Sequence, residues 1–410
     1  MHILRNKNVV ILLSGQFISR IGNNLFSLAL YWYVLSETHS RSALGFVGAL
    51  ASLATAVGLI SGVFVDRWDR RRTMIGSDIL RGTLALVLAV FALLHRSPVV
   101  LIASIILCIQ AVGTFFSPAE NSMLPQLVRG EELAEANGVN ASVSSASSMI
   151  GLGLGGALLA FAGPIILFVA NAVSFGVSVF SLLFLKAPLG DVQNRRPQQT
   201  LKQTIITLWN ELADGYRLLL GMPFLRKIIP LAAMANFFLT PLEVLDVAWV
   251  RQVLHQGAFV YGLFGVALVV GSLAGGLMAG PISRRFVHRN VVLSGIALEG
   301  MIVMAFSQIP FAIPDLIMFM FLGATFSVLN SIGLTMIQQA IPDGYFGRIL
   351  GPLVALNTAL RPIGILLSGL IAVDVPLSWV FLTAGLLCIS SLVLGRGMPK
   401  EVSKVVVQSQ

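Results

Sequence analysis

Ionisable side chains placed inside long apolar segments are the residues of this sequence best suited to do chemistry. The candidate acids in or next to such segments are Asp78, Glu120 and Glu243. A charged group at the centre of a bilayer costs about 2.5–3.5 kcal/mol, so such residues commonly mark a pathway for protons or ligands. A partly buried carboxylate can bind a proton on one side of a membrane and release it on the other. We therefore expect proton coupling from these acids, in the order Glu243, Glu120, Asp78.

The same acids also have structural interpretations. Asp78 and Arg81 are three residues apart on one helical face, a spacing that favours an ion pair between them. Glu120 follows a proline that disturbs its helix, and we expect it at the cytoplasmic mouth beside Arg129. Glu299 is a further acid within an apolar segment.

Polar side chains on the first apolar segment are expected to face a cavity. Arg20 lies about 18 Å from the start of that segment at 1.5 Å per residue, hence near the middle of a bilayer. Gln110 and Arg361, on later segments, are further candidates for a substrate cavity. The polar neighbours of Arg20 are Gln16, Ser19, Asn23 and Asn24. Aromatic residues could add an apolar wall, with packing or lipid contact as the alternative: Phe17, Tyr31, Phe115, Phe116, Phe237 and Phe238.

The composition requires a membrane protein with many spans. The chain has 410 residues, of which 56% are hydrophobic and 11% charged, against about 25% charged in soluble domains. Its mean hydropathy is +0.87, too high for a water-soluble globule. Twelve apolar segments are each near the ~20 residues needed to cross the hydrocarbon core. They are 8–35, 43–65, 73–94, 98–117, 136–160, 164–187, 223–249, 258–281, 290–310, 314–340, 347–373 and 376–396.

The basic residues predict the orientation of these segments. Most of the 27 lysines and arginines fall in loops that are cytoplasmic if both termini lie inside. The net charge of +9 therefore records topology in a cell inner (plasma) membrane and contact with anionic lipids, and we expect no nucleic-acid partner.

Several classes of protein are excluded by missing constellations. Cys108 and Cys388 both lie in apolar segments, and the five histidines are scattered, so we predict no metal site. No phosphate-binding Gly-x-x-x-x-Gly-Lys sequence is present, and no catalytic Ser-His or paired-carboxylate arrangement stands at one depth. We expect no enzyme activity, no catalytic residues, no cofactor and a monomeric chain.

The chain divides into two halves around a polar interruption. We predict a six-helix bundle over 1–187, a cytoplasmic linker over 188–222, a second six-helix bundle over 223–396 and a cytoplasmic tail over 397–410. The linker contains an amphipathic helical pattern that begins near Leu201. At an offset of 218 residues Gly62 matches Gly280, Gly82 matches Gly300, and Arg81 falls opposite Glu299, which suggests an internal repeat. The predicted fold is an all-α membrane protein with twelve transmembrane helices in two six-helix pseudo-repeat bundles.

A charged loop follows the second apolar segment, with six ionised residues in the seven positions from Asp66. With Gly62 ahead of it, the loop resembles the Gly-x-x-x-Asp-Arg-x-x-Arg-Arg signature of the major facilitator superfamily. Asp69 stands where that superfamily usually has glycine, as in the macrolide-efflux branch of its drug:proton antiporters. The resemblance implies two bundles that rock around a central cavity, with this loop as a gate. The residues that match the signature are Gly62, Asp66, Arg67, Arg70 and Arg71.

Other motifs of that branch are only partly present. The stretches 112–119 and 346–348 are similar in spacing. Gln110 takes the place of an arginine found in many drug exporters, and Leu152 replaces the proline of their Gly-Pro-x-x-Gly-Gly motif. Both differences weaken the inference of proton antiport.

The resemblance implies a secondary active transporter that exports small hydrophobic or amphipathic compounds, of the macrolide or multidrug type, in exchange for protons. One alternative is a dedicated exporter of a siderophore, peptide antibiotic or lysolipid, in which Arg20 and Arg361 would bind an acidic cargo. A second alternative is a membrane scaffold without transport activity.

Overall fold

A computed structural model describes residues 3–65, 68–94, 98–185, 224–341 and 358–398, with a few single residues at 216–222 and 353–356. In these residues every regular element is a helix. Most of the predicted linker with its amphipathic helix, the stretch 346–348 and most of the predicted tail lie outside the described residues.

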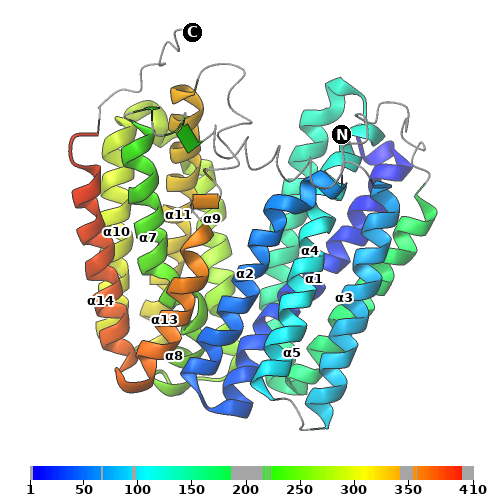
Figure 1. The fold of residues 1–410 in the computed structure, drawn as a ribbon, viewed down its shortest axis with the longest axis horizontal. Helices are drawn as coiled ribbons and strands as arrows, with labels where there is room; N and C mark the ends of the chain where they lie inside the picture. The colour runs from blue at the N-terminus through cyan, green and yellow to red at the C-terminus, as the bar shows by residue number, and fades with distance from the viewer. Residues whose placement is uncertain are drawn as a thin grey trace. The chain divides into compact units, whose positions relative to one another are not determined.

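The helices form two compact units, each described by itself. The first comprises Met1–Arg196 and Val247–Val266, and the second comprises Pro197–Asp246 and Ala267–Gln410. The first unit contains η1 (Ile3–Arg5), α1 (Lys7–Thr38), α2 (Arg41–Val65), α3 (Arg70–Leu93), α4 (Val99–Leu127), η2 (Gly130–Glu132), α5 (Leu133–Phe184) and nearly all of α8 (Asp246–Gln252). The second contains α7 (Leu225–Val244), α10 (His288–Gln308), α11 (Ala312–Ala340), α13 (Arg361–Asp374), α14 (Leu377–Ser390) and η4 (Ser391–Gly395), and α9 (Ala258–Arg285) contributes to both units (Figure 1).

The helices are long and apolar enough to cross a bilayer. Within the described residues, eight helical stretches meet the length and hydropathy of a membrane span. One of them, Gly130–Phe184, runs for 55 residues and turns at Gly163, where φ is 75° and Pro164 follows. It therefore covers two predicted spans joined by a very short loop. The helices α1, α2 and α13 occupy further predicted spans.

The repeat inferred from sequence has a counterpart in helix packing. A Cβ atom on Gly82 of α3 would lie 3.4 Å from Phe175 on α5, and one on Gly300 of α10 would lie 2.7 Å from the Gly385 carbonyl on α14. In each unit the third helix of the half thus packs on its last helix through the matching glycine. Small residues allow such close contact where lipid gives no hydrophobic driving force between helices.

Two prolines lie inside helices near the candidate residues, and hydroxyl groups bond the carbonyls that these prolines leave without a backbone donor. Pro118 of α4 cannot bond the Thr114 carbonyl, which instead accepts a hydrogen bond from Ser61 of α2 at 2.8 Å. Pro241 of α7 likewise frees the carbonyl of Phe237, which accepts from the Thr240 hydroxyl at 2.7 Å. Both carbonyls are therefore paired, although a proline cannot donate to them.

Candidate functional site

An ion pair links the first and fourth helices inside the first unit. Arg20 Nη2 lies 2.6 Å from Glu120 Oε1, and the two side chains are 20% and 10% exposed. Arg20 Nη1 also donates to the carbonyl of Asn140 on α5 at 3.3 Å. Asn24 uses its amide to bond the Arg20 carbonyl one turn back in α1. Three helices therefore converge on one guanidinium.

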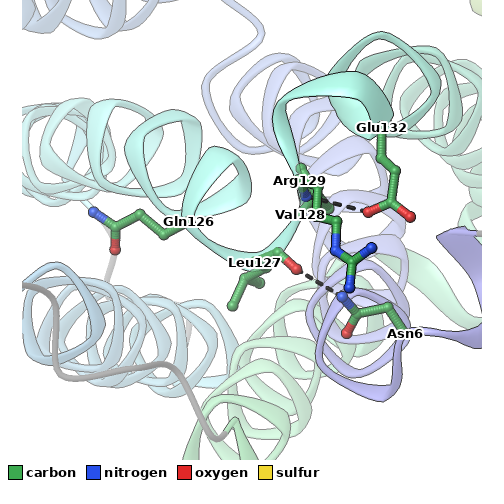
Figure 2. Close-up of a pocket in the computed structure, with 6 residues that line it drawn as sticks. All are labelled: Asn6, Gln126, Leu127, Val128, Arg129 and Glu132. Atoms are coloured by element: carbon green, nitrogen blue, oxygen red, sulfur yellow. Dashed lines mark hydrogen bonds between the residues drawn. The ribbon is translucent and has the colours of Figure 1, made fainter.

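Glu120 was expected at the cytoplasmic mouth beside Arg129, but its ion-pair partner is Arg20, and Arg129 lines a separate cleft at the end of α4. Figure 2 shows its side chain directed toward Asn6, at a cleft lined by residues of α4, η2 and the start of α1. The Arg129 backbone N–H donates to Glu132 Oε2 at 3.1 Å, and Asn6 Nδ2 donates to the Leu127 carbonyl at 2.6 Å. These bonds cap helix ends and include no predicted transport residue.

A second ion pair lies in the same unit, on α3. Arg81 Nη1 is 3.6 Å from Asp78 Oδ1, which confirms the predicted pairing. Asp78 is fully buried, and Arg81 also donates to Asn23 Oδ1 at 3.0 Å. The guanidinium carbon lies 4.3 Å from the centre of the Phe175 ring, within the range of a cation–π contact. Arg81 is thus held by a carboxylate, an amide and a ring at once.

The third ion pair belongs to the second unit. Arg361, the first residue of α13, contacts Glu243 Oε2 on α7 through both Nε and Nη2, each at 2.8 Å. A Cβ atom on Gly364 would lie 2.6 Å from Thr240 Oγ1 and 3.0 Å from Phe237, so α13 approaches α7 closely here. The two side chains remain 47% and 40% exposed, and this is the most open of the three pairs.

The described part of the charged loop fastens helices of the first unit. Asp69 caps α3 by accepting from the Arg72 backbone N–H at 2.8 Å. Arg71 donates to the carbonyls of Leu182 and Leu183 in the last turn of α5, at 2.7 and 2.6 Å. A cation at a helix C-terminus stabilises the helix dipole.

The remaining signature residues of this loop are placed only in part. Gly62 lies in the last turn of α2, and Arg70 Nη1 reaches the Ser122 carbonyl of α4 at 3.5 Å. Asp66 and Arg67 lie outside the described residues.

Part of the predicted polar stripe packs on protein instead of facing a cavity. Gln16 is 2% exposed and donates to Ser178 of α5 at 3.1 Å, and Ser19 is also buried. Gln110 is exposed on α4. Among the aromatic candidates, Phe115 stacks on Trp68 at 5.8 Å, and Phe116 belongs to the apolar core of the first unit.

The structure brings together residues whose association sequence reasoning missed. The three arginines within spans each pair with one of the three acids proposed for proton coupling. The sequence could reveal only the Asp78–Arg81 pair, by its spacing. In the other two pairs the partners are 100 and 118 residues apart. Asn140 and Phe175 were not among the predicted residues and have no local signal.

Ion pairs within long apolar helices, together with eight described stretches that could each cross a bilayer, indicate an integral membrane protein. A model of the Major Facilitator Superfamily matches residues 12–351, and the chain belongs to that family. It is 24% identical over 394 residues to macrolide efflux protein A of Streptococcus pyogenes, across 92% of each chain. It is 25% identical over 386 residues to the multidrug efflux pump Tap of Mycolicibacterium fortuitum, again across 92% of each chain.

The chain is similar in fold to solved transporter structures. A bacterial homologue of the iron transporter ferroportin in an inward-facing state has a TM-score of 0.70 and 19% identity, over 95% of this chain and 99% of that one. A D-xylose–proton symporter has a TM-score of 0.69 and 14% identity, over 97% and 99%. At these identities the likeness shows the fold alone.

Proposed function

We propose that this chain is a secondary active transporter that exports small hydrophobic or amphipathic compounds by alternating access, with protons as the exchanged ion. The names of its relatives support efflux of macrolides or several drugs. We further propose a plasma-membrane location with both termini cytoplasmic, and a monomer whose bundles are 1–187 and 223–396, with 188–222 as linker and 397–410 as tail.

The observation that supports proton exchange is the Arg20–Glu120 ion pair. The Glu120 carboxylate of α4 accepts from Arg20 of α1, and the Asn140 carbonyl of α5 accepts from the same guanidinium. A proton on Glu120 would remove the negative charge and weaken that contact, which gives protonation a route to helix movement. Asp78 with Arg81 is the second candidate in the same unit, and Glu243 is the third.

Export of an acidic siderophore, peptide or lysolipid is the second candidate function. It requires a free cation in the transport path, and Arg20 and Arg361 are each already paired with a carboxylate. The pairing of both arginines therefore counts against an acidic cargo. If the protein is instead a scaffold without transport activity, no compound should show a gradient-dependent flux.

Transport into everted membrane vesicles tests the proposal. Vesicles should accumulate a macrolide or a dye on energisation and lose it when an uncoupler is added. In the Glu120→Gln variant this accumulation should fall at least about tenfold, while exchange of labelled for unlabelled cargo continues. Glu131→Gln, at an exposed acid of η2, is the matched control and should behave as wild type. Accumulation that is unaffected by the uncoupler would refute proton exchange.

A further inference from the structure

The connection between α9 and α10 carries three arginines and no acid. Arg284 and Arg285 are the last two residues of α9, and Arg289 is the second residue of α10. The sequence has no aspartate or glutamate between Asp246 and Glu299. Within the described residues none of the three arginines forms an ion pair, and Arg289 Nε is buried without a hydrogen-bond partner. The described side chains therefore leave this positive charge without a counter-charge.

The corresponding loop of the first unit carries its own anions. At the repeat offset of 218, Asp69 corresponds to Val287, and Asp66 corresponds to Arg284. The backbone is nearly the same at the two capping positions, with φ −67° and ψ 115° at Asp69 and φ −63° and ψ 123° at Val287. Asp69 accepts from the Arg72 backbone N–H, whereas no side chain caps α10. The second loop therefore lacks both carboxylates and has an arginine in place of one of them.

Exposed apolar side chains adjoin the three arginines. Phe286 and Val287 lie between them in the sequence and are 56% and 45% exposed. Leu277 of α9 is 82% exposed, and it lies seven residues before Arg284, hence on the same face of the helix and about 10 Å deeper along it. Because α9 has the length and hydropathy of a membrane span, its last turn lies at the membrane surface and Leu277 lies within the hydrocarbon.

This combination of charge and apolar surface suits a phospholipid with a negative headgroup. A guanidinium binds phosphate oxygens through two parallel hydrogen bonds. The acyl chains of the same molecule would cover the exposed side of α9, which a soluble phosphate would leave uncovered. Under the proposed topology this end of α9 faces the cytoplasm, where the leaflet is rich in anionic lipids.

We propose that Arg284, Arg285 and Arg289 bind the phosphate of an anionic phospholipid. Its acyl chains lie along α9 past Leu277, and Phe286 lies at the boundary between headgroup and chains. The lipid supplies the negative charge that Asp69 supplies to the first loop from within the chain. The leaflet in which the site lies rests on the proposed topology, whereas lipid binding does not depend on transport.

The test is lipid binding to the purified full chain in detergent micelles, titrated with phosphatidylglycerol and measured by native mass spectrometry. Phosphatidylcholine with the same acyl chains has no net charge and serves as the comparison. Wild type should bind phosphatidylglycerol more tightly. In the double variant Arg284→Gln with Arg285→Gln this binding should weaken at least about tenfold, because each arginine near a membrane surface contributes about fivefold. Binding of phosphatidylcholine should stay the same.

A second variant writes the missing acid into the loop. Val287→Asp places a carboxylate where the first loop has Asp69. It should weaken phosphatidylglycerol binding severalfold, because the new carboxylate competes with the lipid phosphate for the arginines. The Tm should stay the same or rise, because α10 gains a capping side chain. A general loss of structure cannot produce weaker binding at an unchanged or higher Tm.

The matched control for charge is Arg72→Gln with Arg226→Gln. It removes the same net charge as the double loop variant, from two exposed arginines outside the loop. This control should bind phosphatidylglycerol as wild type does. Thermal unfolding compares every variant with wild type before binding is measured.

Four results would overturn the proposal. The first two are equal binding of the two lipids by wild type, and unchanged phosphatidylglycerol binding in either loop variant. The third is an equal loss in the control, which would show attraction to net charge alone. The fourth is displacement of the lipid by an equimolar amount of glycerol 3-phosphate, which would identify a site for soluble phosphate.

The lipid site and the exporter fail separately, because lipid binding requires no gradient. Uncoupler-sensitive export without a preference for phosphatidylglycerol refutes the lipid site alone. The expected lipid binding without such export refutes the exporter and keeps the lipid site.

Discussion

Two arginine–glutamate pairs, one in each compact unit, differ in how far water reaches them. Arg20 and Glu120 in the first unit are 20% and 10% exposed, whereas Arg361 and Glu243 in the second are 47% and 40% exposed. Their shortest contacts are nearly equal, at 2.6 and 2.8 Å. The two pairs therefore differ in burial and not in contact distance. A buried charge that loses its partner stays uncompensated, but an exposed one can take a cation from solution.

Helices α3 and α10 show a second contrast between the units. At the repeat offset of 218, Asp78 and Arg81 of α3 correspond to Ile296 and Glu299 of α10. Both helices pack on the last helix of their half through a matched glycine. Within the described residues no cation pairs with Glu299, which is 4% exposed. The two helices thus share a packing contact, but only α3 carries an ion pair among the described residues.

The largest expected effect is on the stability of the buried pair. Arg81→Met leaves the fully buried Asp78 without its cation and should reduce the free energy of unfolding by about 3–5 kcal/mol. Arg361→Gln, at the exposed pair, should cost less than about 1 kcal/mol. Denaturation in mixed micelles measures both. Equal losses would remove the distinction between buried and exposed pairs.

Double-mutant cycles should separate the two glutamate pairs directly. We expect a coupling energy of about 2 kcal/mol or more between Arg20 and Glu120, since the charges are partly desolvated. The coupling between Arg361 and Glu243 should stay below about 1 kcal/mol and fall further in high salt. The unfolding free energies of the two single variants and the double variant give each value. A salt-sensitive Arg20–Glu120 coupling would contradict its burial.

The matched glycines offer a test of the repeat itself. Gly300→Ala should cost about 1–3 kcal/mol, because its Cβ would meet the Gly385 carbonyl at 2.7 Å. Gly82→Ala should leave the free energy of unfolding nearly unchanged, because the added Cβ would lie 3.4 Å from its nearest neighbour, the Phe175 side chain. Thermal unfolding of the two variants under one condition compares them. A greater loss at Gly82 would show that α3 packs more tightly than α10.

The smallest effect is expected at the charged loop. Arg71→Ala removes two hydrogen bonds to the end of α5 and should cost about 0.5–2 kcal/mol. Arg72→Ala is the matched control, since that side chain is exposed and its backbone N–H still donates to Asp69. In thermal unfolding, the Arg71→Ala variant should have a lower Tm than the Arg72→Ala variant. Indistinguishable variants would mean that Arg71 does not fasten α5 in the membrane.

The membrane class, the approximate helices and the family could be predicted from the sequence because they depend on local properties. Hydropathy over about 20 residues identifies a span whatever its neighbours are, and the loop from Gly62 to Arg71 carries the family signature in one contiguous stretch. The Asp78–Arg81 pair was predictable for the same reason, since one helical turn brings the two side chains together.

Tertiary structure alone decided which distant charges pair and how exposed each pair is. Nothing local links Arg20 to Glu120, so the acid was expected beside Arg129, and Gln16 was expected in a cavity although it packs on Ser178. Pairing and exposure depend on which faces of different helices meet, and a sequence pattern records the face of each helix but not its neighbour. The sequence determined where the charges lie along the chain; the fold decided that Glu243 is open and Glu120 is closed.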